Sequence, residues 1–342
     1  MNVETLENYT SQLFTVAPGV WGRKEIFVNL YFIQDQATGN WALVDAGLKW
    51  SAPKIKAMAK ELFGEGTKPV AIILTHGHFD HIGAVAPLIK EWNVPVYAHY
   101  LEFPYLNGKS SYPPADPSVG GGMMSLMSWA YPTGPVNIAE HLHKLPDNGT
   151  VPGLTEWRYV HTPGHSPGHI SLFRESDKVL IAGDAFVTTK AESAIEALSG
   201  TKNLSGPPKY LTCNWASAKQ SVIKLEALKP EIAATGHGKP MSGEELKTEL
   251  SKLSTHFDDL AIPAEGRYVN EPAVTNEQGV VFLPPSNTDK LSAVVKVIGV
   301  TLAIASIAVL IFQQTKKKEK PQEGTTGKLA DLSKTSVQLT SR

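Results

Sequence analysis

The sequence is poor in cysteine: Cys213 is the only one among 342 residues. A single thiol cannot form a disulfide within the chain, and it excludes zinc sites built from several cysteines. A metal ion bound by this chain would therefore take its ligands from histidine and carboxylate side chains. A single cysteine also fits a reducing compartment.

The chain also lacks a strong net charge and a recognisable signal peptide. Its formal net charge is −1 at pH 7, so no global field attracts it to nucleic acid. We therefore expect a small-molecule substrate and no nucleic-acid partner. The N-terminal stretch MNVETLENYTSQLFTV contains neither the basic start nor the apolar core of a secretory signal. With 42% hydrophobic and 19% charged residues, the composition is that of a folded protein.

One long apolar run lies near the C-terminus. Residues 291–312 contain a single charge, Lys296, and about 20 apolar residues suffice to cross a bilayer core. We predict a transmembrane helix there, followed by a basic, disordered tail over residues 313–342. We expect a membrane-associated protein with its catalytic domain in the cytoplasm, although the lysines of the tail would favour the opposite orientation. A buried or interfacial helix is the alternative.

The rest of the chain divides by composition. Residues 10–262 alternate strand-like and helix-like segments and are expected to form one folded domain, and residues 263–290 are interpreted as an extension or linker. Within the domain, residues 103–150 are rich in Pro and Gly and contain the apolar side chains of residues 123–129. Such a segment is typical of a lid over a site, or of a short apolar helix packed on the core.

Histidine and aspartate are concentrated in one short stretch, THGHFDH, at residues 75–81. Random placement would give the pattern His-x-His-x-Asp-His on the order of a few times in ten thousand such chains. His76 and His78 are two positions apart, so both imidazoles can point to one side of an extended segment. Asp80 and His81 follow in the next turn and can reach a second, neighbouring position.

Three buried, strand-like runs end in the same residue types. His76 follows VAIILT, Asp184 follows VLIAG, and His237 follows IAAT after one glycine. Because open α/β folds place their chemistry at strand ends, we expect these side chains to meet at the rim of a sheet. A further cluster, HTPGHSPGH at residues 161–169, lies in a turn whose Pro-Gly pairs forbid a helix. We interpret this cluster as a turn that presents side chains to the site, and a solvated histidine loop is the alternative.

Together these residues resemble the signature of the metallo-β-lactamase-fold superfamily, which is His-x-His-x-Asp-His followed by His, Asp and His. The matching positions are His76, His78, Asp80, His81, His165, Asp184 and His237. The resemblance covers about residues 10–262. It implies an α+β fold, a four-layer αβ/βα sandwich with the metal site at one edge of two facing sheets, to which we add the predicted C-terminal transmembrane helix.

The resemblance also implies a set of ligands for two divalent ions, most simply zinc, with manganese and iron as alternatives. The first ion would be held by His76, His78 and His165. The second would be held by Asp80, His81 and His237, and Asp184 would bridge both. A hydroxide shared by the ions would attack a carbonyl group, and the expected catalytic residues that orient it or move its proton are Asp80 and Asp184. Asp45 would support the ligand loop, while His161 and His169 would lie outside the ligand shell.

Departures from related groups narrow the expected reaction to ester, thioester or lactone hydrolysis. Asp184 stands where β-lactamases of this fold usually carry Cys or Ser, and His78 stands where diiron flavoproteins carry Glu. Acyl-homoserine lactonases commonly have Tyr where this chain has Val187, which weakens but keeps the lactonase interpretation. Hydroxyacylglutathione hydrolases share all seven ligands, but their basic glutathione-binding residues have no match here.

Two alternative functions remain, one that changes the bond cleaved and one that is not enzymatic. A phosphodiesterase on the same dinuclear site would need cationic groups, and Lys109, Lys190 and Lys202 form no tight cluster in the sequence. A catalytically idle, membrane-anchored binding protein would be expected to have lost ligands, and all seven are present. The apolar residues 123–129 would favour an apolar acyl or aromatic substrate.

Overall fold

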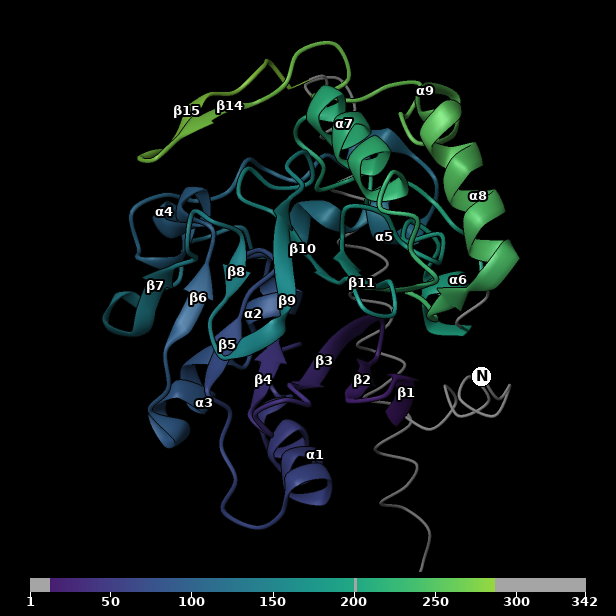
Figure 1. Ribbon diagram of the computed structural model, residues 1–342. Coiled ribbons are helices and arrows are strands. Elements are labelled where there is room, and N and C mark those ends of the chain that lie inside the picture. Colours follow the sequence, from purple (N-terminus) through teal and green to yellow (C-terminus); the bar gives the residue numbers. More distant parts are fainter. Residues whose placement is uncertain (1–12, 200–201, 287–342) are drawn as a thin grey trace, which may run out of the picture. The chain divides into compact units, whose positions relative to one another are not determined.

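The computed structural model describes residues 13–199 and 202–286, in which two β-sheets face each other (Figure 1). The first sheet has seven strands in chain order. They are β1 (Leu13–Ala17), β2 (Val20–Glu25), β3 (Val28–Gln34), β4 (Trp41–Val44), β5 (Ala71–Ile73), β6 (Val96–Ala98) and β7 (Leu142–Lys144). The strands β1 to β4 pair antiparallel, and β4 to β7 pair parallel.

The second sheet has six strands, in the order β13-β12-β11-β10-β9-β8. They are β8 (Thr150–Val151), β9 (Leu154–His161), β10 (Ile170–Arg174), β11 (Val179–Gly183), β12 (Ile232–Thr235) and β13 (Met241–Ser242). Only β11 and β12 pair parallel, and the other neighbours pair antiparallel. The carboxyl ends of β11 and β12 therefore lie at one edge of this sheet.

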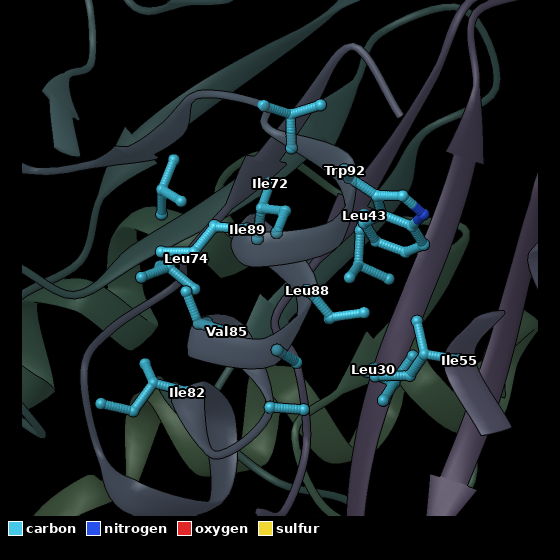
Figure 2. Packing of buried hydrophobic residues seen from close by; sticks show 14 of the residues in the cluster. Leu30, Leu43, Ile55, Ile72, Leu74, Ile82, Val85, Leu88, Ile89 and Trp92 are labelled. Carbon is cyan, nitrogen blue, oxygen red and sulfur yellow. The ribbon is translucent and has the colours of Figure 1, made fainter. Parts of the chain in front are cut away.

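The first sheet buries a different set of side chains on each face, because successive strand residues point to opposite sides. Leu30 and Phe32 of β3 pack with the helices α1 (Ala52–Phe63) and α3 (Val85–Trp92), whereas Tyr31 and Ile33 face the second sheet. Figure 2 shows the helix-facing cluster, in which Leu88 and its neighbours on α3 contact the strand residues. One amphipathic helix layer thus covers the outer face of the first sheet.

The second sheet follows the same rule. Leu172 and Ile181 point toward the first sheet, while Phe173 and Leu180 pack under the helices α7 (Trp215–Glu226) and α8 (Gly243–Thr255). The two helices lie side by side over this sheet (Figure 1). Two helix layers therefore enclose two mixed sheets, as the expected four-layer αβ/βα sandwich requires.

Short elements connect these layers. The remaining helices are α2 (Phe79–Ile82), η3 (Tyr100–Glu102), α4 (Phe103–Leu106), η4 (Pro117–Val119), α5 (Met123–Leu126), η5 (Ser128–Ala130), η6 (Ala139–His141), α6 (Ala194–Ser199) and α9 (Phe257–Leu260). The segment interpreted as a linker contains a hairpin of β14 (Val274–Asn276) and β15 (Gly279–Phe282). Arg267 and Tyr268, just before this hairpin, donate hydrogen bonds to Asp116 Oδ2 and to the carbonyl oxygen of Pro114.

The expected transmembrane helix requires a correction. Within residues 13–199 and 202–286, no helix is both long and apolar enough to cross a bilayer. The longest described helix, α8, has 13 residues, or about 20 Å against the ~30 Å of a bilayer core. It also buries only one face, through Leu246, Leu250 and Leu253. The predicted span, residues 291–312, and the tail after it lie outside the described residues. The transmembrane part of the fold class, and the membrane partner and localisation based on it, are withdrawn.

Candidate metal centre

The motif THGHFDH forms the loop after β5 and one short helical turn. His76 lies three residues beyond the end of β5, and His78 immediately precedes α2, which contains Asp80 and His81. The backbone N–H of His81 donates to the carbonyl oxygen of His78 at 2.9 Å and closes the turn. All four side chains are buried, so one loop presents four potential ligands to the interior.

The other predicted ligands come from the second sheet. His165 lies in the loop between β9 and β10, Asp184 follows β11 directly, and His237 lies two residues after β12. Asn29 of β3 joins this edge to the first sheet, because its side-chain amide donates to the carbonyl oxygens of Thr235 and Gly238. The ends of the two sheets are thereby held together at the point where the seven side chains meet.

Asp184 occupies the centre of the cluster. Its Oδ2 lies 3.1 Å from His237 Nε2, 3.4 Å from His165 Nε2 and 3.6 Å from His81 Nε2. Asp80 Oδ2 is 3.6 Å from His237 Nε2. The carboxylate of Asp184 thus lies between histidines that were assigned to different ions.

The structure brings all seven predicted residues together. Potential ligand atoms lie within 4.8 Å of one another in three groups: His76, His78 and His165; His76, His81 and Asp184; and Asp80, His81 and His237. His161 and His169 belong to none of these groups. Neighbouring groups share His76 or His81, so the three groups form one continuous cluster of potential ligands.

The hydrogen-bond pattern fits a divalent cation. His81 Nδ1 donates to Asp45 Oδ2 at 2.8 Å. His76 Nδ1 lies 3.0 Å from Thr75 Oγ1, whose own proton goes to Asp45 Oδ2. The ring of His76 therefore keeps Nε2 unprotonated. Neither His76 Nε2 nor His81 Nε2 has a hydrogen-bond partner among the described residues. A buried polar atom without a partner costs about 1–3 kcal/mol, which coordination to a cation would offset.

Two ring nitrogens of the first group also lie within hydrogen-bond distance of each other. His165 Nδ1 lies 3.2 Å from Thr212 Oγ1, which donates its own proton to the carbonyl oxygen of Pro208, so His165 Nε2 is the unprotonated nitrogen. This atom lies 3.0 Å from His78 Nδ1. Such an approach of ring nitrogens is typical of two ligands on one ion.

Burial keeps the first three histidines neutral, which is the metal-binding form. Burial lowers the pKa of His76 and His165 well below the usual range, and the surrounding imidazoles add to the effect. It lowers the pKa of His78 to about 3, again with help from His81. Protons would therefore not compete with a cation for these ligand atoms near neutral pH.

The carboxylate of Asp184 is ionised. Burial alone would raise its pKa, but the neighbouring His237 and His81 outweigh that effect and hold the pKa well below its usual range. The same charges act in reverse on His81, where Asp184 and Asp45 overcome the effect of burial and raise the pKa. The centre thus combines the neutral imidazoles of His76, His78 and His165 with a negative carboxylate. Imidazole and carboxylate form a donor set for Zn²⁺, Mn²⁺ or Fe²⁺.

Residues outside the cluster orient the ligands. Asp45 accepts hydrogen bonds from Thr75 and His81, as expected for a residue that supports the loop. His237 Nδ1 donates to the carbonyl oxygen of Phe27 at 2.8 Å. His169 Nε2 accepts from the backbone N–H of Asp184 at 2.8 Å and so fixes the start of that turn. Because His81 and His237 are held through Nδ1, the Nε2 atom of each ring faces the centre.

Glu102 was not recognised in the sequence. It is fully buried and accepts hydrogen bonds from Gly77, Tyr112, Ser166 and Gly168. Burial raises its pKa, and the four donors oppose that shift. The available signal was its position four residues after β6, the same strand-end placement that pointed to His76.

The apolar segment over residues 123–131 contains short helices, as one of the two interpretations made from the sequence expected. It forms α5 and η5, and the ring of Tyr131 lies 5.4 Å from that of Phe79, beside the ligand loop. Met123, Met127 and Trp129 are each about half exposed. The segment is therefore a short helical element anchored next to the centre, with apolar side chains left at the surface.

Comparisons with known proteins agree with this geometry. The family model of the metallo-beta-lactamase superfamily matches residues 23–237. The probable metallo-hydrolase YflN of Bacillus subtilis is 44% identical over 248 residues, which cover 72% of this chain and 94% of YflN. A hydroxyacylglutathione hydrolase of Rhodopseudomonas palustris is 32% identical over 45% of this chain and 46% of its own length. The crystal structure of a beta-lactamase domain protein from Burkholderia ambifaria, at 23% identity, shares the fold with a TM-score of 0.50 over 72% of this chain and 76% of that one.

Proposed function

This chain belongs to the metallo-beta-lactamase superfamily and is a metallo-hydrolase, and from that premise we propose that it cleaves ester, thioester or lactone bonds at a dinuclear centre. The observation that carries the proposal is the convergence of seven His and Asp side chains from four separate loops. A scaffold that had lost its activity would be expected to have lost some of them.

We assign His76, His78 and His165 to one ion and Asp80, His81 and His237 to the other, with Asp184 between them. Zinc is the metal we favour, because neutral imidazole and carboxylate are its usual ligands where thiolate is absent. When bound, two such ions polarise a carbonyl oxygen and bring the pKa of water toward neutrality.

The residues of the chain then have separate tasks. Two contacts position the carboxylate of Asp184 at the centre of the cluster. The backbone N–H of Asp184 donates to His169 Nε2, and Asp184 Oδ2 lies next to His237 Nε2. Asp80 Oδ2 lies 3.6 Å from His237 Nε2, within the same buried space. Either carboxylate can accept the proton of an attacking water and orient its lone pair toward the substrate, so both remain our candidates for the catalytic base.

Two observations bear on the substrate. The hydroxyacylglutathione hydrolase relatives act, by their name, on a thioester of glutathione, and this supports thioester cleavage by the present chain. The match covers less than half of the length of these relatives. Met123, Met127 and Trp129 are half exposed and belong to the segment whose Tyr131 contacts Phe79 of the ligand loop, and they support an apolar acyl or aromatic group. A phosphodiesterase is less well supported, because Lys202, one of its candidate phosphate-binding residues, is paired with Glu245 at 3.4 Å.

The deciding experiment is an activity panel on the full chain loaded with Zn²⁺ or Mn²⁺. Aryl esters, acyl thioesters, lactones and an aryl phosphodiester would be compared by kcat/KM, with the Asp184→Ala variant as the blank. We expect cleavage of at least one carbonyl substrate and none of the phosphodiester. Preference for the phosphodiester would reject the proposed substrate class.

A further inference from the structure

One buried carboxylate joins the two loops that present the first group of ligands. Glu102 Oε2 accepts from the backbone N–H of Gly77 at 2.9 Å, and Gly77 lies between His76 and His78. Glu102 Oε1 accepts from Ser166 Oγ at 2.9 Å and from the backbone N–H of Gly168 at 2.6 Å, one and three residues after His165. Each oxygen of Glu102 therefore serves one loop.

The two glycines are required for this contact. A Cβ atom on Gly168 would lie 2.8–2.9 Å from Glu102 atoms, and one on Gly77 would lie 2.4 Å from the hydroxyl of Tyr112. That hydroxyl accepts from the Gly77 N–H at 2.9 Å and donates to Glu102. Gly77 and Gly168 thus allow both loops to approach the same carboxylate closely.

The remaining ligands depend on other partners. His81 donates to Asp45, and His237 donates to the carbonyl oxygen of Phe27. Neither His81 nor His237 donates a hydrogen bond to Glu102, whose partners are Gly77, Tyr112, Ser166 and Gly168. Asp45 supports His81 directly and reaches His76 only through Thr75. Glu102 therefore lies behind the loop positions that present His76, His78 and His165.

We propose that Glu102 is a positioning residue that sets the affinity of this one metal position, and that it leaves the position of Asp80, His81 and His237 largely unaffected. The inference rests on the proposed assignment of ligands to two ions. Loss of a hydrogen bond behind a ligand typically weakens metal binding 10–100-fold. A residue that merely stabilised the fold would weaken both positions together.

The test is a titration of the metal-free full chain with Co²⁺, followed by its visible absorption and by calorimetry. Glu102→Gln keeps the size of the side chain but replaces one acceptor oxygen by an amide that faces N–H or O–H donors. We expect one of two binding steps to weaken about 10–100-fold and the other to change by less than about threefold. Equal weakening of both steps, or of neither, would overturn the inference.

Combining Glu102→Gln with a second substitution identifies the metal position that it affects. In His78→Ala, which should retain only the second position, Glu102→Gln should have no further effect. In His237→Ala, which should retain the first, it should still weaken binding. If the His78→Ala variant binds two ions with unchanged affinity, the proposed assignment of ligands is wrong. If it binds one ion and Glu102→Gln still weakens the binding of that ion, the assignment stands and only the proposed role of Glu102 is wrong.

Asp35 offers a matched control, because it is also a buried carboxylate that accepts hydrogen bonds from two separate segments, at Thr38 and Thr155. Asp35→Asn should lower stability and leave both Co²⁺ steps unchanged. If Glu102→Gln does not fold, Ser166→Ala and Tyr112→Phe each remove one donor from the network. Both should weaken the same step by a smaller factor, and an effect confined to the other step would reject the proposal.

Discussion

Asp184 Oδ2 lies 3.1 Å from His237 Nε2, although 53 positions separate the two residues in the chain. The contact exists because β11 and β12 run parallel and end at the same edge of the second sheet. Their carboxyl ends place an ionised carboxylate next to an imidazole whose other nitrogen is held by Phe27. The local sequence of each strand end therefore supplies a candidate ligand, and the parallel pairing of the two strands brings these side chains together.

The seven ligands should separate into two functional groups. We expect His78→Ala and His81→Ala each to lose one ion, and Asp184→Ala to weaken both. Activity should fall by more than about 100-fold in each case, since even contacts behind the ligands cost 10–100-fold. Metal content after dialysis, measured together with kcat/KM, checks this. Full metal content and activity in all three variants would refute the assignment.

Asp45 should act through the orientation of His81. In Asp45→Asn, the side-chain amide can no longer accept from both Thr75 and His81 Nδ1, so the tautomer that exposes Nε2 is less favoured. We expect metal affinity to fall about 10–100-fold, mainly at the position of His81. Competition with a chelator of known affinity measures the change. Unchanged affinity would show that the ring is held by its other contacts.

Asp35 predicts a pH dependence of stability away from the centre. Burial opposes its ionisation, but the hydroxyls and N–H groups of Thr155 and Thr38 outweigh it and lower the pKa of Asp35 to about 2. A lowered folded-state pKa stabilises the fold above the unfolded value of about 3.9, and the gain disappears as the pH falls toward 2. The contribution at neutral pH is on the order of 2 kcal/mol.

Urea unfolding of Asp35→Asn checks that contribution. At pH 7 the variant should be less stable than the parent chain by about this amount, and the difference should shrink as the pH is lowered from 4 toward 2. The metal-free form of both proteins is the appropriate comparison, because acid also releases metal. A difference that stays constant over this range would mean that the ionisation of Asp35 does not contribute.

Much of the centre could be predicted from the sequence, because its ligands are local in origin. The spacing of His76 to His81 and the three buried runs that end in His or Asp are properties of short segments. The sandwich was expected from the family resemblance, and its physical basis is visible in the structure, where residues such as Leu30 and Tyr31 pack on opposite faces of β3.

The parts that were missed depend on long-range contacts. Glu102 is 25 positions from Gly77 and 66 from Gly168, and no local pattern pairs them. The hairpin of β14 and β15 contacts Ser110 through the N–H of Val280, so its order comes from a distant partner. The predicted span at residues 291–312 lies outside the described residues, and no helix within the described residues is long and apolar enough to cross a bilayer.

The apolar side chains of residues 123–131 should determine the size of the acyl group. Burying an exposed aromatic or Met side chain against a substrate contributes about 1.5–3 kcal/mol, so Trp129→Ser and Met127→Ser should each lower kcat/KM for long acyl or aromatic substrates roughly 10- to 100-fold. Short substrates should be unaffected, because they do not reach these side chains. Ile223→Ser, on the outer helix α7, removes a comparably exposed apolar group away from the centre and serves as the control. A uniform effect across chain lengths, or none, would show that this segment has no part in substrate recognition.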